Sequence, residues 1–154
     1  MRRSDREMSA EFALRVLSEA EFATLSSVSA DGQPYGVPLS QVVLDGAVYF
    51  HCAAEGHKLE NLAAEPRVSV SAVSRTKLVP EKYTTEYDSA IAFGRCEIVT
   101  EADEKTRALL AICEKYAPQD MEKAAGMIAR SLGETCVCRV TIERITGKSN
   151  GGAE

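Results

Sequence analysis

The sequence predicts one mainly β domain of the α+β class, an antiparallel β-barrel with helices at its periphery. Two Asp-Gly dipeptides, Asp31-Gly32 and Asp45-Gly46, lie between runs of β-favouring residues, which is the strongest short-range signal of a β-hairpin. Most strand-like segments follow one another without a helix between them, which favours antiparallel pairing over alternating βα units. The length of 154 residues suits one compact core, so we expect a single domain over residues 1–154.

Residues 1–20 are expected to form an amino-terminal arm and a helix of about three turns. Ser9 is a suitable N-cap, because its hydroxyl can accept a hydrogen bond from the first turn. The apolar residues that follow recur at i, i+1, i+4 and i+5, which suits one face of a helix. They are Phe12, Ala13, Val16 and Leu17. From Phe22 to Phe50, the two Asp-Gly turns predict three antiparallel strands.

The next two segments predict a short helix and a strand. Gly56 to Glu65 has helical character and is closed by Pro66, which cannot continue a helix. Arg67 to Val73 alternates between small apolar residues and serines, which is typical of a strand with one dry and one wet face.

A polar connection is expected from Ser74 to Asp88, before another long strand from Ser89 to Val99. Its tyrosines and threonines favour a functional or interface loop over a simple spacer. The roles of Tyr83 and Tyr87 stay open, because either ring could stack on a ligand or pack at a subunit interface.

Two helices and a strand complete the predicted fold. Thr100 to Asp103 resembles a capping box with Asp in place of Glu, and the helix that it opens should end before Pro118. A last helix is expected over about 121–132 and a strand over 135–146. The glycine-rich residues 147–154 are expected to be a loose tail.

Composition narrows the classes of partner. The chain has 45% hydrophobic and 27% charged residues and a net charge of -5, which is typical of a soluble globular protein. It has no basic stripe with interleaved aromatic residues, so we expect no nucleic-acid partner. The longest uncharged stretch, Gly32 to Leu44, contains two prolines and is too short to cross a bilayer, and Met1 to Met8 lacks the apolar block of a secretory signal. We therefore expect no membrane partner, a cytoplasmic location and cysteines that stay reduced.

The densest group of chemically useful residues runs from His51 to Lys58. A strand ends there, Gly56 turns the chain, and a helix begins with His57 and Lys58. A helix start exposes unpaired N–H groups and the positive end of its dipole, so these residues could hold a phosphate. The alternative is that Lys58 is a solvated helix residue and His57 an ordinary turn residue.

Several segments, in order and spacing, resemble the signature segments of the pyridoxamine-phosphate-oxidase-like flavoproteins. They are Val37-Pro38-Leu39-Ser40, Tyr49-Phe50-His51-x-Ala53, Gly56-His57-Lys58, Pro66-Arg67-Val68-Ser69 and Ser89-Ala90-Ile91-Ala92-Phe93-Gly94. Both ends of the chain are similar to the nitroimidazole-resistance branch. The segments that carry this likeness are Met1-Arg2-Arg3-x-Asp5-Arg6-Glu7-Met8, Lys115-Tyr116 and Ile145-Thr146-Gly147-Lys148.

The resemblance implies an FMN-binding split β-barrel and a homodimer with FMN at the subunit interface. Lys58 and His57 match the phosphate-binding pair, although the family often has arginine at the position of His57. The family's pattern further places cofactor-binding residues in four segments. They are Pro38, Leu39 and Ser40 along the isoalloxazine ring, His51 and Ala53 in the strand-end segment, Ser89 at a flavin-contacting position, and Lys148 near the ring or the substrate.

His51 is the candidate catalytic residue. A histidine in this strand-end segment lies beside the flavin in the nitroimidazole-resistance proteins and is linked to substrate handling. The alternative is that His51 only hydrogen-bonds the ribityl chain or a carbonyl group. Cys52 next to it should point to the other face of the strand, which argues against a His-Cys couple.

Cys136 and Cys138 share one face of the last predicted strand. Zinc needs three or four ligands, and the sequence offers no second cysteine pair, so we expect no metal site and interpret both cysteines as small buried hydrophobes.

The predicted function is that of an FMN-dependent oxidoreductase that reduces nitroimidazoles or similar small planar molecules. One alternative is a flavin- or haem-binding sensor or carrier without turnover, with His51 or His57 as an axial ligand. A second is pyridoxamine 5′-phosphate oxidation, which the absence of tryptophan and of an arginine-containing carboxyl-terminal segment disfavours. No Gly-rich dinucleotide fingerprint follows a strand, so the electron donor is not indicated.

Overall fold

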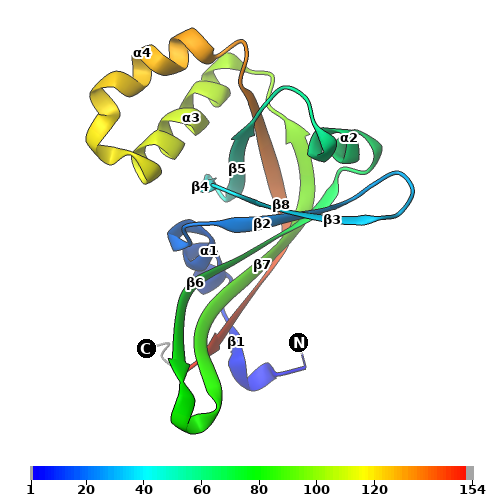
Figure 1. The fold of residues 1–154 in the computed structure, drawn as a ribbon, viewed down its shortest axis with the longest axis vertical. Helices are drawn as coiled ribbons and strands as arrows, with labels where there is room; N and C mark the ends of the chain where they lie inside the picture. Colours follow the sequence, from blue (N-terminus) through cyan, green and yellow to red (C-terminus); the bar gives the residue numbers. More distant parts are fainter. Residues whose placement is uncertain (1, 152–154) are drawn as a thin grey trace.

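The computed structural model describes residues 2–151, and its strands form one antiparallel sheet (Figure 1). The sheet order is β3-β2-β6-β7-β8-β5-β4, and β1 pairs with β8 outside this path. The strands are β1 (Glu7–Met8), β2 (Ala23–Val28), β3 (Pro34–Leu39), β4 (Val42–Leu44), β5 (Ala47–Cys52), β6 (Arg67–Val79), β7 (Thr84–Ile98) and β8 (Cys136–Asn150). The helices are α1 (Ala10–Glu19), α2 (His57–Ala64), α3 (Ala102–Tyr116) and α4 (Met121–Ser131), and short 3-10 turns lie at Ser4–Arg6, Pro80–Lys82 and Pro118–Asp120.

The sheet curves into a split barrel that stays open between β3 and β4, which follow each other in the chain but lie at opposite ends of the sheet order and do not pair. Only Ser40 and Gln41 separate the two strands. The expected antiparallel barrel with peripheral helices is therefore confirmed. The expectation of three strands between Phe22 and Phe50 was wrong, because the middle strand is divided at this corner.

Both Asp-Gly hairpins are confirmed. Asp45 and Gly46 have φ values of 50° and 77°, so both central residues are left-handed, as a two-residue turn between antiparallel strands requires. Gly32 has a φ of 88° in the longer turn between β2 and β3. The first helix is also confirmed, and the Ser9 hydroxyl accepts a hydrogen bond from the N–H of Phe12 at 3.2 Å.

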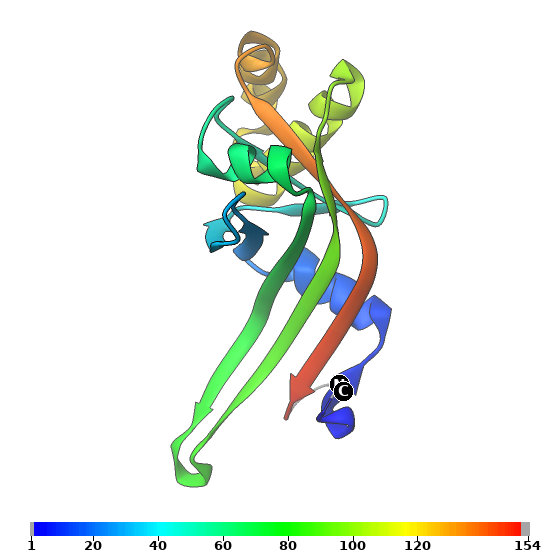
Figure 2. The same ribbon diagram turned by 90° about the vertical axis from the view of Figure 1, so that its right-hand side faces the viewer.

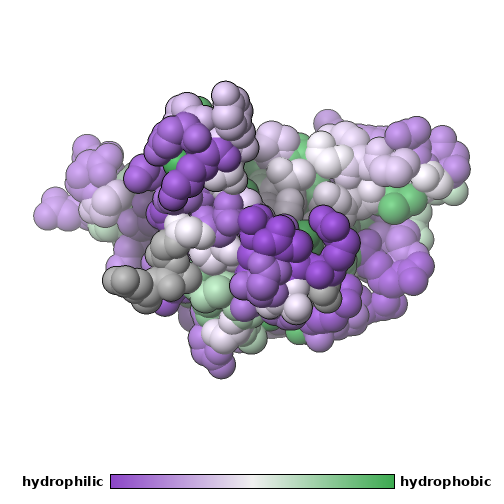
Figure 3. All heavy atoms as spheres, turned by 90° about the horizontal axis from the view of Figure 1, so that it is seen from below, coloured by the Kyte–Doolittle hydropathy of each residue, from purple (hydrophilic) through white to green (hydrophobic). Residues whose placement is uncertain are grey.

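The polar connection expected from Ser74 to Asp88 is instead the continuation of two strands. β6 and β7 form a long hairpin that extends far from the helices, and its tip is the turn Pro80–Lys82 (Figure 2). Its sequence is polar because the hairpin projects from the body of the molecule. At its base, Arg75 Nε and Ser149 Oγ donate hydrogen bonds to Asp88 at 2.8 and 2.6 Å. Seen from this end, the surface is mostly hydrophilic, with small separate hydrophobic areas (Figure 3).

The tail expected to be loose over 147–154 is in part a strand. β8 continues through Gly147, which pairs with Met8, and Lys148, which pairs with Glu7 and with Ser89 of β7. A Cβ at Gly147 would lie 3.0 Å from the Phe12 ring, so a glycine lets α1 pack closely on the strand. Residues 152–154 of that tail, like Met1 of the arm, lie outside the described residues.

The helix over Ala102–Tyr116 ends before Pro118 as expected, but its predicted capping box does not form. Glu101 is the N-cap, and its side chain makes no capping hydrogen bond. α3 packs against β4 and β5, α4 packs against α3, and the two helices bury a second, smaller apolar cluster. No helix within residues 2–151 has both the length and the apolar character needed to cross a membrane.

The main core fills the barrel between α1 and the inner faces of the strands. Its most buried members include Leu17 of α1, Leu25 of β2, Phe50 of β5 and Val70 of β6. On β6, Val68, Val70 and Ala72 face this core and the serines face outward, as the alternation predicts. The outward faces of β2, β6 and β7 lie on the other side of the sheet from this core.

Candidate functional site

β3 is an edge strand whose free side presents backbone polar groups. Ser29 N–H donates to the Gln33 carbonyl at 2.9 Å, which makes these two residues a hydrogen-bonded pair of the β2–β3 ladder. Every second residue from Gln33 therefore bonds to β2, while Pro34, Gly36 and Pro38 direct their backbone groups away from it. The carbonyls of these three residues and the N–H of Gly36 thus face the free edge, and the prolines, which lack an N–H, occupy positions where no ladder bond is lost.

The corner after β3 is held in place from three sides. Gln41 is fully buried, and its Nε2 donates to the carbonyls of Leu17 and Ala20, each at 2.9 Å. Its backbone N–H donates to the hydroxyl of Tyr116 at 3.0 Å. Lys115 Nζ donates to the Ala20 carbonyl at 2.8 Å and to that of Gln41 at 2.9 Å. The end of α1, the corner and the end of α3 therefore form one unit that fixes the position of Ser40.

The start of α2 is an open set of backbone donors. Gly56 is the N-cap with a φ of 130°, and no side chain caps the helix. The N–H groups of Leu59 and Glu60 bond to the Gly56 carbonyl, which leaves those of His57 and Lys58 for a ligand. A Cβ at Gly56 would meet no atom within 4 Å, so the space above the turn is open. Lys58 Nζ makes no hydrogen bond or ion pair to residues 2–151.

The side chain of His57 is already engaged. Its Nε2 lies 3.2 Å from Ser29 Oγ and its Nδ1 lies 3.5 Å from a carboxylate oxygen of Glu60. Its ring also meets the Tyr35 ring edge-on, with 4.7 Å between the ring centroids. These contacts place the start of α2 against the beginning of β3. Pro38, Leu39 and Ser40 lie three to five residues further along the strand, about 10 to 16 Å away.

His51 is exposed near the end of β5, and its imidazole makes no hydrogen bond within the described part of the chain. Cys52 packs against the main core, whereas Tyr49 belongs to the cluster under α3 and α4. By strand alternation, His51 shares the side of Tyr49 and points away from Cys52, as expected. Ala53 is exposed in the loop that leads to α2.

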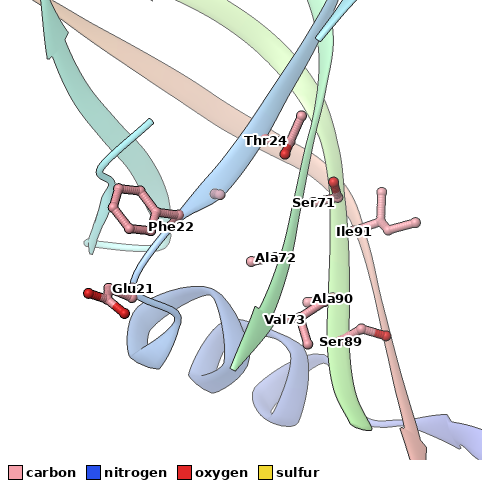
Figure 4. Close-up of a pocket in the computed structure, with 10 residues that line it drawn as sticks. Glu21, Phe22, Thr24, Ser71, Ala72, Val73, Ser89, Ala90 and Ile91 are labelled. Atoms are coloured by element: carbon pink, nitrogen blue, oxygen red, sulfur yellow. The ribbon is translucent and has the colours of Figure 1, made fainter. Parts of the chain in front are cut away.

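A hollow of about 520 Å³ lies on the outward face of β2, β6 and β7 (Figure 4). Its lining combines hydroxyl groups with exposed apolar side chains. The residues that line it include Phe22, Thr24, Ser71, Val73, Ser89 and Ile91. Phe22, Val73 and Ile91 are 57%, 49% and 40% exposed, which is unusual for three large apolar residues on one face of a small domain.

The predicted site residues fall into separate groups. Ser89 and Lys148 are paired in register on the outward face, with Ser89 Oγ 3.4 Å from the Lys148 carbonyl. Lys148 Nζ lies 5.5 Å from the centre of the Tyr87 ring. A row of paired residues leads from Pro38 across the strands to this face. Pro38 pairs with Thr24, Thr24 with Ser71, and Ser71 with Ile91. Pro38 and Ile91 are three strand spacings, or about 14 Å, apart. Within one chain, Pro38 and Ser89 are therefore too far apart to contact the same group.

Cys136 and Cys138 are buried in the main core, as expected. The structure adds Cys52 of β5, which pairs with Cys136, so three thiols meet inside the barrel. Burial raises the pKa of the Cys136 thiol, which keeps it protonated at neutral pH.

Several residues of this region were not identified from the sequence. Phe22, Thr24 and Ser71 have no motif of their own and come together only through the pairing of β2 with β6. The Lys115-Tyr116 pair was noted only for its likeness to other sequences, while its bonds to the corner depend on how α3 packs. The sequence around this pair gives no local signal that its side chains bond to the corner after β3.

Comparison with known proteins places these features in a family. The family model described as pyridoxamine 5′-phosphate oxidase matches residues 9–149. No curated protein matches the chain.

Solved structures agree with the fold. A candidate 5-nitroimidazole antibiotic resistance protein from Bacteroides thetaiotaomicron is 21% identical over 93% of this chain and 86% of its own, with a TM-score of 0.75. The FAD and heme binding protein from Mycobacterium smegmatis is 21% identical over 96% of this chain and 74% of its own, with a TM-score of 0.82. An FAD-binding protein from Mesorhizobium loti is 24% identical over 95% of this chain and 98% of its own, with a TM-score of 0.71. At these identities the likeness establishes the fold.

Proposed function

Since the chain belongs to the pyridoxamine 5′-phosphate oxidase family, we propose that it is an FMN-dependent oxidoreductase whose cofactor lies along the free edge of β3. The phosphate would be held at the start of α2 and the isoalloxazine ring at Pro38, Leu39 and Ser40. When bound, FMN supplies the electron pair for reduction of a small molecule.

One observation carries this proposal: an uncapped helix start lies against the beginning of an edge strand whose alternate backbone groups face away from the sheet. The N–H groups of His57 and Lys58 and the ammonium group of Lys58 suit a phosphate dianion. The imidazole of His57 is engaged by Ser29 and Glu60, so we assign to this residue its backbone N–H.

The edge of β3 suits the rim of a flavin ring. The ring rim carries one N–H donor and several acceptors, and β3 offers the Pro38 carbonyl and the Gly36 N–H on its free side. The ribityl phosphate chain and the ring together would span the three to five strand residues between the start of α2 and this position.

The separation of the predicted residues favours a homodimer. The exposed apolar face that includes Phe22, Val73 and Ile91 is the surface that we assign to the second copy. Ser89 and Lys148 of one chain would then complete the site of the other, which accounts for their distance from Pro38 of the same chain.

We assign reduction of nitroimidazoles or similar planar molecules as the reaction, because the chain shares its fold with a candidate resistance protein of that kind. His51 is assigned to substrate handling, since its imidazole has no hydrogen-bond partner within residues 2–151 and is exposed.

The test begins with the purified protein. Its cofactor is released by denaturation and identified by chromatography, and the reduced protein is then mixed anaerobically with a nitroimidazole while flavin absorbance is followed. We expect FMN and reoxidation faster than in a buffer control. A Soret band would point to haem instead, and a colourless protein without affinity for FMN would contradict the proposal.

A further inference from the structure

Three thiols from two strands meet inside the barrel. Cys52 of β5 pairs in register with Cys136 of β8, and Cys138 lies two residues further along on the same face. Their sulfur atoms all lie within 4.8 Å of one another, and those of Cys136 and Cys138 are 4.0 Å apart. Cys136 and Cys138 are buried and Cys52 is half-buried, so the cluster is shielded but can be reached from one side.

We propose that Cys52, Cys136 and Cys138 form a site for one soft monovalent cation, Cu(I), bound by three sulfur atoms. Metal–sulfur bonds of about 2.3 Å in a trigonal plane place the sulfurs about 4.0 Å apart. The separation of Cys136 and Cys138 already has this value, so the cation could bind with only a small movement of Cys52.

The ligand set fits Cu(I) better than zinc. Structural zinc takes four ligands in a tetrahedron. Within residues 2–151 no histidine, carboxylate or fourth thiol lies within 4.8 Å of all three sulfur atoms, although the buried Cys96 thiol neighbours that of Cys138. His51 points to the other side of β5, and His57 is held by Ser29 and Glu60. Thiolates alone select soft cations, of which Cu(I) accepts three-coordination.

Binding releases three thiol protons to solvent, so one Cu(I) with three thiolates carries two negative charges. The half-buried Cys52 leaves one side of the bound site open to solvent, where that charge can be screened.

The experiment uses the full-length, reduced protein under anaerobic conditions. Cu(I) is titrated in competition with the chelator bicinchoninate, and the ultraviolet sulfur-to-copper charge-transfer band is followed. We expect one Cu(I) per chain and, by X-ray absorption, three sulfur atoms at about 2.3 Å. A preference for Zn(II), a two-sulfur site, or failure of the protein to take Cu(I) from the chelator would overturn the proposal.

Variants identify the ligands. Cys138→Ser and Cys52→Ser should each weaken Cu(I) binding by on the order of 100-fold, because even outer-shell partners of a metal contribute 10- to 100-fold. Cys113→Ser removes a thiol on α3 outside the cluster and should leave binding unchanged. Cys52 is half-buried, so its variant keeps the test valid where Cys138→Ser fails to fold. Equal loss in Cys113→Ser and Cys52→Ser would overturn the proposal. Riboflavin affinity, measured in parallel, reports the flavin site separately.

Discussion

The ammonium group of Lys115 lies 2.9 Å from the carbonyl oxygen of Gln41, the residue at which the chain turns from β3 to β4. Gln41 in turn caps the end of α1 through its side chain. The two residues join both ends of the sheet to two helices, so the geometry of the β3 edge depends on contacts between segments far apart in the sequence.

Replacing Gln41 with Leu should lower the free energy of unfolding by about 2 to 3 kcal/mol. Two buried carbonyls, those of Leu17 and Ala20, would lose the amide that bonds to them, and only Ala20 keeps a donor in Lys115. Urea denaturation measures the change. Gln119→Leu, at an exposed position, is the matched control and should change stability little.

Replacing Lys58 with Ala should weaken FMN binding by about 10- to 100-fold, the equivalent of one charge-assisted hydrogen bond of about 1.5 to 3 kcal/mol. Riboflavin, which lacks the phosphate, should bind the variant and the parent protein equally. Flavin fluorescence quenching measures both affinities. Lys77→Ala on the exposed hairpin is the control. An equal loss of riboflavin and FMN affinity would place the phosphate elsewhere.

A charge on the outward face should separate the two copies of the proposed dimer. Ile91→Glu would bury a carboxylate at the interface without a partner, so we expect a monomer by light scattering and weaker flavin retention. Met127→Glu introduces the same charge at an apolar residue of α4 that is 52% exposed, and it should leave the dimer intact. A parent protein that is already monomeric would refute this assignment of the face.

Acid should loosen the base of the β6–β7 hairpin. Burial alone would raise the pKa of Asp88, but the hydrogen bonds from Arg75 and Ser149 outweigh it, and the pKa lies below its ordinary value. A carboxyl group of this kind stabilises the fold fully above the pKa of the unfolded chain, near 3.9, and its contribution disappears as the pH falls through the lower, folded value. Asp88→Asn should therefore destabilise the protein at pH 7 and flatten the loss of stability below pH 4, as followed by thermal melting. Asp103→Asn, at an exposed position, should change neither the stability at pH 7 nor the loss of stability below pH 4.

Gly94 occupies the irregular step between β7 and β8, where a Cβ would collide with the backbone carbonyl of Thr141. Gly94→Ala should cost about 1 to 3 kcal/mol of stability, because two central strands would have to move apart. Gly133→Ala, where a Cβ meets no atom within 4 Å, should be nearly neutral. Equal effects in chemical denaturation would contradict the observed register.

Local patterns predicted the elements whose signals are local. Ser9, the Asp-Gly turns and Pro118 act through their own backbone geometry, and each marks a boundary that the structure confirms. Residues 74–88 were misassigned because strand pairing far from the core leaves no hydrophobic alternation. Residues 147–150 were misassigned because the three residues between Gly147 and Gly151 gain their order only from pairing with β1 and β7.

The residues of the candidate site also divide into those with a local sequence signal and those without one. The helix start at His57 and Lys58 could be predicted, since strand, glycine and helix are adjacent in the sequence. The hollow beside Phe22 and the third thiol, Cys52, could not, because they depend on which strands become neighbours.

A crystal structure of the protein with FMN tests the central claim most directly. The account predicts phosphate oxygens at the N–H groups of His57 and Lys58 and at Lys58 Nζ, with the ring rim facing the Gly36 N–H and the Pro38 carbonyl. Electron density for FMN elsewhere, or side chains that fill the edge of β3 at saturating FMN, would contradict it.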